Sequence, residues 1–331
     1  MERLSIIVPV YNEQEVLGAF YSRLSSVLGS LPCQAEILFV NDGSSDGTAA
    51  ILERLAAQDS RVKVLGFTRN FGHQAALSAG LDHCSGDAAV LIDADLQDPP
   101  ELITDFHKKW REGFQVVFGQ RRRLEEGFLK RSVYHLFYQA LHLLANIEIP
   151  LDSGDFSLLD RGIVQRLRAL PERTRFLRGL RSWVGLRQTG LEYERPARHS
   201  GSSKYSLAGL FKLAFDGIVS FSTLPLKLAL FLGLLVSAAG FLGVLLLVYL
   251  RLIHAFDLPG WTSLMIVVLF LGGIQLTTIG IVGEYIARIY EEVKFRPLYL
   301  VESRLGFPDE EAGASPEERP RRIKAAVRSV Q

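Results

Sequence analysis

Short runs of apolar residues recur five times within the first 120 positions, and polar residues follow most of them. Runs of this length, rich in Val, Ile, Leu and Phe, are typical of strands buried on both faces of a parallel sheet. Helical periodicity at 13–28 and 48–58 separates the first runs, so the pattern predicts an α/β domain with a mainly parallel sheet. The runs are LSIIVPVY, AEILFVND, VKVLGFT, AAVLIDAD and FQVVFGQ.

Two much longer apolar stretches lie toward the other end of the chain. No charged residue interrupts positions 229–250 or 258–283. Each stretch reaches the length of about 20 residues that a helix needs to cross the hydrocarbon core of a membrane. The connection between them is short, so they predict a C-terminal two-helix transmembrane hairpin. Lys and Arg are more frequent in its flanks than in its connection, which predicts a cytoplasmic location for the N-terminal domain and both termini. The alternative is a pair of buried helices in a soluble core.

Amphipathic helices are predicted between the sheet and the apolar stretches. Apolar positions recur along one helical face at about 127–147 and again at 205–225. The second segment directly precedes an apolar stretch, so we predict an interfacial helix at the lipid headgroups. For the first segment, a face packed on the core is an equal alternative. The predicted organisation is an α/β domain at 1–204, the interfacial helix at 205–225, two membrane helices within 226–290, and a tail at 291–331 that is disordered after about 307.

Composition and motifs narrow the chemistry. The 37 Lys and Arg residues nearly balance the 36 Asp and Glu residues, so the net charge of +1 gives no bias toward nucleic acid. Cys33 and Cys84 stand alone and far apart, which excludes a disulfide framework or a zinc site built on cysteine pairs. The sequence contains neither GxGxxG nor a P-loop, so dinucleotide binding and P-loop chemistry lose their usual support.

Acidic residues stand at the predicted carboxyl ends of the strands, the edge at which parallel sheets bind ligands. Asp93 and Asp95 end the fourth run, and such a pair can hold a hard divalent cation together with phosphate oxygens. Asp42 and Glu13 follow the second and first runs, where carboxylates can accept hydrogen bonds from a base and a ribose. These residues predict a nucleotide pocket with a metal-held diphosphate; the alternative is a solvated turn. Asp98, before a proline, is predicted to cap the next helix.

Six motifs, in order, resemble a known family. SIIVPVYNEQE, LFVNDGSSDGT, RNFGHQAALSAGL and LIDADLQDPPE are similar to the motifs of family-two glycosyltransferases of GT-A fold. DSGDFSLLDR and RPARHSGSSKYSL, followed by two predicted membrane spans, resemble the polyprenyl-phosphate branch of that family. This branch contains bacterial undecaprenyl-phosphate glucosyltransferases and dolichyl-phosphate mannose synthases. The resemblance covers about residues 4 to 300.

The resemblance implies an inverting enzyme that moves a sugar from a nucleoside diphosphate to a polyprenyl phosphate. UDP-glucose and undecaprenyl phosphate are the expected substrates; GDP-mannose, an aminoarabinose donor and dolichyl phosphate are the alternatives. The expected cofactor is Mg²⁺ or Mn²⁺, a Lewis acid for the departing diphosphate. The implied metal ligands are Asp93, Asp95 and Gln97. The implied nucleotide-binding residues are Pro9, Tyr11, Glu13, Asp42, Asp93 and Ala94.

The acceptor side needs cations more than it needs a base. A phosphate monoester is already largely ionised at neutral pH, so the requirement is a clamp that brings two anions together. The resemblance implies acceptor-phosphate contacts from Arg121, Lys130, Arg131, Arg198 and Lys204. Asp155 is expected near the acceptor, either as a base or as an orienting group. The residues expected to be catalytic are Asp95, Asp155, Arg198 and Lys204.

Two rival functions are weighed against this prediction. A processive polysaccharide synthase would carry a QxxRW element, whereas the nearest text here is RGLRSWVG, without the glutamine. A non-catalytic lipid-binding scaffold would not need the complete set of acids. The predicted partners are therefore a nucleotide sugar, a polyprenyl phosphate and the cytoplasmic membrane, without nucleic acid; a homotetramer is compatible with the resemblance.

Overall fold

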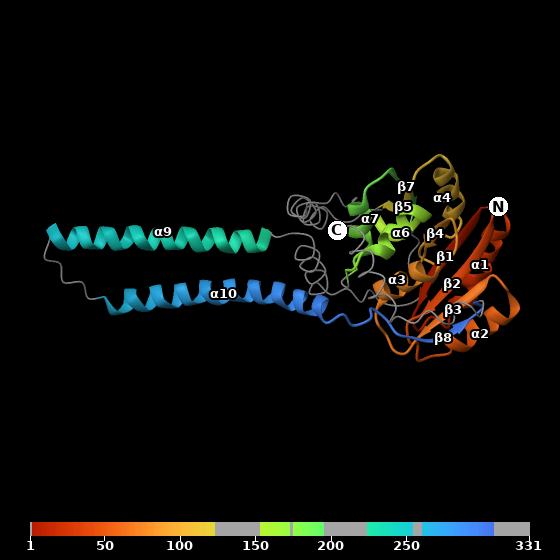
Figure 1. The fold of residues 1–331 in the computed structure, drawn as a ribbon, viewed down its shortest axis with the longest axis horizontal. Helices are drawn as coiled ribbons and strands as arrows, with labels where there is room; N and C mark the ends of the chain where they lie inside the picture. The colour runs from red at the N-terminus through yellow and green to blue at the C-terminus, as the bar shows by residue number, and fades with distance from the viewer. Residues whose placement is uncertain (1, 123–152, 173–174, 195–223, 254–259, 308–331) are drawn as a thin grey trace, which may run out of the picture. The chain divides into compact units, whose positions relative to one another are not determined.

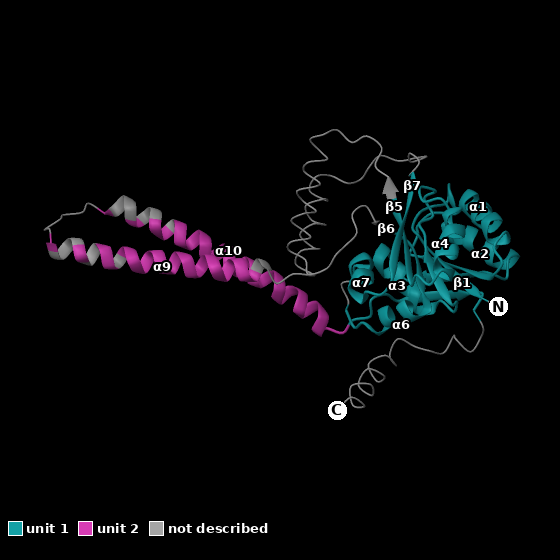
Figure 2. Ribbon diagram, turned by 90° about the horizontal axis from the view of Figure 1, so that it is seen from above, with its two compact units in different colours: residues 1–138, 147–204, 296–331 teal, residues 139–146, 205–295 magenta. Residues whose placement is uncertain are grey.

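The chain forms two compact units. The computed structural model describes residues 2–122, 153–172, 175–194, 224–253 and 260–307. The first unit contains the sheet and comprises 1–138, 147–204 and 296–331. The second comprises 139–146 and 205–295 and contains two long helices (Figure 2).

In the described residues, the first unit contains an eight-stranded mixed sheet with strand order β7-β5-β6-β4-β1-β2-β3-β8 (Figure 1). The central strands β4, β1, β2 and β3 are mutually parallel, and β5 is parallel to β7. Strands β6 and β8 pair antiparallel to their neighbours. The prediction of an α/β fold with a mainly parallel sheet is therefore confirmed. The strands are β1 (Arg3–Val10), β2 (Gln34–Asn41), β3 (Val62–Phe67), β4 (Ala88–Leu91), β5 (Val116–Arg122), β6 (Ser153–Asp160), β7 (Gln188–Glu194) and β8 (Val301–Leu305).

Helices cover both faces of the sheet, which explains why its strands are apolar on both sides. Leu4, Ile6 and Val8 of β1 belong to a core that includes apolar residues of α1, α2 and α4. Ile7 faces the other way and contacts α3, where a Cβ at Gly80 would lie 2.1 Å from its Cγ2 atom. The helices of this unit are α1 (Leu17–Gly29), α2 (Thr48–Gln58), α3 (His73–His83), α4 (Leu102–Arg111), α6 (Arg161–Ala169) and α7 (Leu177–Val184).

Strand β8 brings the segment after the apolar helices back to the sheet edge. It pairs antiparallel to β3, and just before it the Tyr299 ring stacks on Phe67 with centroids 5.1 Å apart. The Tyr299 hydroxyl also donates a hydrogen bond to Asp82, 2.9 Å away. No apolar run in the sequence predicts this strand, because VESRL is short and mostly polar.

The second unit contains α9 (Leu224–Ile253) and α10 (Trp261–Val293), which run side by side in both views (Figures 1 and 2). Each helix is long and apolar enough to cross a membrane, over Leu226–Gly243 and Phe270–Val293. In these windows 6% and 0% of the residues are buried, whereas a core helix of a soluble protein is mostly buried. Helix α10 itself continues to Val293, past the uncharged stretch that ends at 283. The segments at 127–147 and 205–225, predicted as amphipathic helices, lie outside the described residues, apart from Leu224 and Pro225 at the start of α9.

Asp59, between α2 and β3, is a structural carboxylate that should limit acid stability. It accepts hydrogen bonds from Arg61 and from the Tyr21 hydroxyl, 2.7 Å away, and the Arg61 hydrogen bond above all lowers its pKa to about 2. A depressed pKa stabilises the fold above the unfolded value of about 3.9, and this contribution is lost as the pH falls toward 2. Because Arg61 is 36% exposed, we expect only about 1–2 kcal/mol. In Asp59→Asn, denaturant unfolding followed by circular dichroism should therefore show a shallower loss of stability between about pH 4 and pH 2. An unchanged slope would contradict this assignment; Asp105→Asn, in an exposed ion pair with Lys108, is the control.

Candidate active site

The loops at the carboxyl ends of β1 and β2 are joined by hydrogen bonds. The Asn12 side chain accepts from the backbone N–H of Ser45 at 2.8 Å, and Gln14 accepts from Gly47 at 2.8 Å. In return, the hydroxyl of Thr48 accepts from the backbone N–H of Glu13 at 3.0 Å. Because parallel strands end at the same edge, these contacts place the YNEQE and NDGSSDGT motifs beside each other.

Asp42 joins the second loop to the third. Its Oδ1 and Oδ2 atoms accept from the backbone N–H groups of Phe71 and Gly72, at 2.6 and 3.0 Å. Burial raises the pKa of Asp42, although these hydrogen bonds act in the opposite direction. The close approach needs a glycine next to it, because a Cβ at Gly43, whose φ is +68°, would lie 2.5 Å from the carbonyl carbon of Arg69. The Asp42 carboxylate therefore holds the loop after β3 next to the loop after β2, and its contact with a base stays a prediction.

The other residues predicted to bind the nucleotide differ in accessibility. Tyr11 is 46% exposed at the end of β1, and Glu13 is half-buried next to it. Pro9 lies buried within β1, and Ala94 is buried after β4. Tyr11 therefore has the most accessible side chain of this set for stacking or hydrogen bonding.

The predicted metal ligands lie in a loop after β4, which ends at Leu91, four residues earlier than the apolar run predicted. Asp93 is 31% exposed, and Asp95 is half-buried with its Oδ1 accepting from the backbone N–H of Gln97 at 3.1 Å. Leu96, between Asp95 and Gln97, has a φ of +61°, a conformation that a leucine rarely adopts and that turns the chain tightly here. The Gln97 side chain is nearly buried.

This loop fits a cation that shares its coordination with a substrate. No group of three or more His, Cys, Asp or Glu residues poised for a metal occurs in the described part of the chain. Two partly accessible carboxylates, however, match the one or two that Mg²⁺ usually takes when phosphate oxygens complete its coordination. The donor set therefore suits a divalent cation bound together with a diphosphate.

Asp98 has a different role from the one predicted. Helix α4 begins after Glu101 without a side-chain cap, so the helix-capping prediction is wrong. The buried Asp98 carboxylate instead accepts a hydrogen bond from the Tyr193 hydroxyl of β7. Asp98 thus connects the loop after β4 to the edge strand β7.

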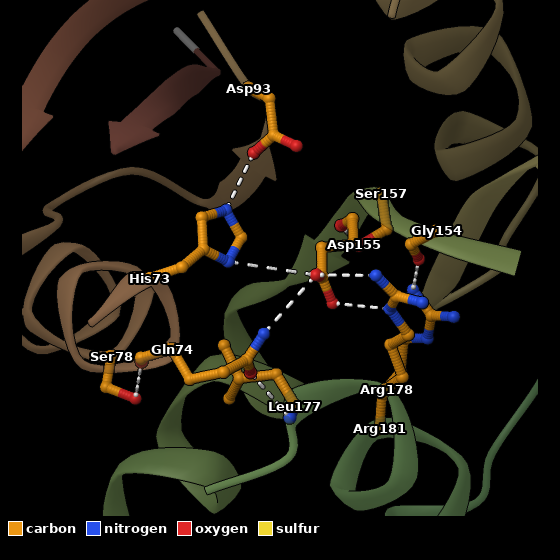
Figure 3. Close-up of polar contacts among 10 residues, drawn as sticks. All are labelled: His73, Gln74, Ser78, Asp93, Gly154, Asp155, Ser157, Leu177, Arg178 and Arg181. Carbon is orange, nitrogen blue, oxygen red and sulfur yellow. Dashed lines mark hydrogen bonds and ion pairs between the residues drawn. The ribbon is translucent and has the colours of Figure 1, made fainter. Parts of the chain in front are cut away.

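Asp155 of β6 is the centre of a polar cluster (Figure 3). Its two oxygens accept hydrogen bonds from the guanidinium of Arg178 in α7, from Nε to Oδ1 at 2.9 Å and from Nη2 to Oδ2 at 3.0 Å. The Gln74 amide donates to Oδ2 at 3.3 Å, and the Nδ1 atom of His73 lies 3.9 Å from the same oxygen. The Nε2 atom of His73 contacts Oδ1 of Asp93 at 2.8 Å. The cluster therefore extends from the loop after β4 to α7.

The charges in the cluster favour an ionised carboxylate and a protonated imidazole. Burial alone would raise the pKa of Asp155, but Arg178 and His73 outweigh it and hold that pKa below its usual value. Partial burial lowers the pKa of His73, yet the hydrogen bond and charge of Asp93 outweigh it and raise that pKa from its ordinary value. Burial lowers the pKa of Arg181 to about 10, so this guanidinium stays charged at neutral pH. The cluster thus holds its cations beside Asp155.

Four of these residues were not predicted as site residues: His73, Gln74, Arg178 and Arg181. Arg181 is 2% exposed, donates to the Gly154 carbonyl at 3.4 Å and lies over the Phe118 ring. Its Nε and Nη2 atoms have no hydrogen-bond partner among the described residues. His73 and Gln74 lie in the motif RNFGHQAA, which could have identified them as site residues. Nothing in RGLRSW indicates which arginine contacts Asp155.

Most of the residues predicted to contact the acceptor phosphate are not among those that the structure describes. Lys130, Arg131, Arg198 and Lys204 lie outside the described residues, and of Arg121 only the backbone, in β5, is described. Among the predicted catalytic residues, the structure therefore describes Asp95 and Asp155, and His73 connects their neighbourhoods through Asp93.

The structure is an α/β protein whose candidate site residues lie at the carboxyl edge of its sheet. The family model described as glycosyl transferase family 2 matches residues 5–168. An uncharacterized glycosyltransferase of Bacillus subtilis, YkcC, is 47% identical over 303 residues, covering 91% of this chain and 94% of that protein. The chain belongs to glycosyl transferase family 2 and is therefore an enzyme that transfers a sugar.

Two further comparisons are relevant. The SfII prophage-derived bactoprenol glucosyl transferase of Shigella flexneri is 43% identical over 300 residues, covering 90% of this chain and 97% of that protein. Among solved structures, the mannosyltransferase PcManGT of Pyrobaculum calidifontis, in complex with GDP-Man and Mn²⁺, matches 88% of this chain and 87% of its own. Its sequence identity is 17% and the TM-score is 0.46.

Proposed function

We propose that the enzyme transfers glucose from UDP-glucose to a polyprenyl phosphate, of which undecaprenyl phosphate is the expected form. The observation that carries this proposal is the 43% identity to a bactoprenol glucosyl transferase along 90% of the chain. Other proteins named as bactoprenol glucosyl transferases match at 41–43% over a similar length. Identity of this extent includes the apolar helices as well as the sheet.

The donor is proposed to bind at the carboxyl ends of β1, β2 and β4. Tyr11 and Glu13 would contact the nucleoside, in a pocket whose wall Asp42 fixes through its hydrogen bonds to the next loop. Asp93 and Asp95, with Gln97, would hold Mg²⁺ or Mn²⁺ on the diphosphate. Such a cation, when bound, neutralises charge that develops on the leaving diphosphate.

The acceptor phosphate is proposed to act as nucleophile without a strong base. Both oxygens of Asp155 are already engaged by Arg178, and its pKa is held below the usual range, so it is poorly suited to take a proton. We assign it an orienting role: Asp155 holds Arg178 and Gln74 in place at the acceptor side. The basic residues Arg121, Lys130, Arg131, Arg198 and Lys204 are proposed to contact the acceptor phosphate.

The apolar helices are proposed to keep this site at the lipid surface. A polyprenyl phosphate carries its reactive group at headgroup level, so the enzyme has to work beside the membrane. Helices α9 and α10 have the length and composition to span it. We propose that both termini and the catalytic domain are cytoplasmic, where nucleotide sugars are available, and that the chain assembles as a homo-oligomer, with a tetramer the expected form.

A substrate panel tests the proposal. Purified full-length enzyme is incubated with undecaprenyl phosphate, Mn²⁺ and UDP-glucose, GDP-mannose or a UDP-aminoarabinose donor, and glycolipid is detected by mass spectrometry. We expect one hexose per lipid from UDP-glucose, loss of product on chelation and its return when Mn²⁺ is added back. Transfer from GDP-mannose alone would replace glucose by mannose in the proposal. Folded enzyme that forms no product with any donor would overturn it.

A further inference from the structure

The first two residues of α3, His73 and Gln74, connect three separate parts of the first unit: the loop after β4, strand β6 and helix α7. His73 contacts Asp93 in the loop after β4 and approaches Asp155 in β6. Gln74 donates to Asp155 and accepts from the backbone N–H of Leu177 at 3.0 Å, at the start of α7. Neighbouring positions at one helix start therefore link the predicted metal loop to the Asp155–Arg178 pair.

His73 engages only one oxygen of Asp93. The contact is made by Oδ1, and no hydrogen bond to Oδ2 is found among the described residues. Figure 3 shows this second oxygen directed away from the imidazole. A carboxylate held through one oxygen has its orientation fixed while the other oxygen stays available to a cation.

The position of His73 is not explained by helix stability or by packing. Its side chain is 44% exposed, so it adds little to the core. Gly72, with a φ of +98°, precedes it, and no side chain caps the helix. The two carboxylates that it faces are the remaining explanation for an imidazole at this position.

We propose that His73 is a positioning residue that orients Asp93 for the divalent cation and ties this carboxylate to Asp155. The inference rests on the proposed function, because it takes Asp93 as a metal ligand. Hydrogen bonds of this kind to metal-binding carboxylates fix their geometry, and removing them typically weakens metal binding about 10–100-fold. Arg178 and Gln74 hold Asp155 in place through hydrogen bonds. The His73 imidazole therefore lies between two carboxylates, those of Asp93 and Asp155.

Mn²⁺ binding provides a direct test that does not depend on turnover. Full-length enzyme in detergent is titrated with Mn²⁺ alone, and the free ion is measured by electron paramagnetic resonance. His73→Ala should raise the Kd about 10–100-fold without changing the thermal unfolding temperature. His73→Gln, whose amide can still donate to Asp93, should recover part of the affinity. His83→Gln is the matched control at the other end of α3, where the ring contacts the Ala79 carbonyl; it should bind Mn²⁺ like the unaltered enzyme.

The Asp95→Asn variant separates failure of this inference from failure of the proposed function. Loss of Mn²⁺ binding in Asp95→Asn together with an unaltered Kd in His73→Ala would overturn the role of His73 alone. Equal Mn²⁺ binding by Asp95→Asn and the unaltered enzyme would overturn the metal assignment, and the positioning role with it. A His73→Ala variant that loses affinity only because its unfolding temperature falls would also count against the proposal.

Discussion

The Asp95→Asn enzyme is expected to lose at least about 10²-fold in the rate of sugar transfer. The substitution keeps the size of the side chain but removes the negative charge that attracts the divalent cation. Without the cation, the charge on the leaving diphosphate is no longer neutralised in the transition state. Asp95 is half-buried in the loop after β4, and its Oδ1 accepts from Gln97, a contact that an asparagine oxygen can keep. The local fold should therefore survive.

Initial rates of glycolipid formation, at the Mn²⁺ concentration that just saturates the unaltered enzyme, provide the measurement. Asp105→Asn is the control, because this carboxylate lies on α4, is 54% exposed and pairs only at the surface with Lys108. It should retain full activity. If Asp95→Asn transferred sugar at the unaltered rate, Asp95 would not be a metal ligand. Excess Mn²⁺ that restored full activity would show instead that the residue affects cation affinity alone.

Breaking the ion pair between Asp155 and Arg178 should produce the largest effect on stability. The Asp155 side chain is 7% exposed, and it would be left as a buried charge without its forked partner in Arg178→Gln. Removing one member of a buried pair typically costs about 3–5 kcal/mol, and we expect the lower end because Arg178 is 32% exposed. This corresponds to a fall of roughly 6–12 °C in the unfolding temperature of a domain of this size. Differential scanning fluorimetry of the detergent-solubilised enzyme measures it.

A double-mutant cycle isolates the pair from its surroundings. Asp155→Asn and Arg178→Gln should each destabilise the enzyme, whereas the double variant should lose clearly less than the sum, since neither charge is then left alone. Arg166→Gln, at an exposed position on α6, controls for the loss of an arginine. Additive losses would mean that the two side chains do not stabilise each other in solution. Activity at varied pH adds a second readout: an orienting Asp155 predicts that Asp155→Asn lowers the rate without moving the acidic limb of the pH profile.

Local sequence was sufficient for the elements whose burial is uniform. The apolar runs at β1, β2 and β3 match the observed strands closely, and the predicted helix at 48–58 coincides with α2. These strands are covered by helices on both faces, so apolar residues occupy most of their positions and the runs are easy to recognise in the sequence. Strand β8 was missed because a short edge strand needs few apolar residues, and its pairing with β3 is contributed by a distant part of the chain.

The sequence by itself determined that acids follow the strands, and a parallel sheet then requires that they share one edge. It also determined the two apolar helices, because their length and composition are local properties. Only the tertiary structure decided which partner each acid has. Asp42 meets two backbone N–H groups, Asp98 meets Tyr193, and Asp155 meets Arg178, through contacts that join residues 23 to 95 positions apart. A carboxylate accepts equally well from any donor that packing brings within about 3 Å, so its identity in the sequence cannot specify its role.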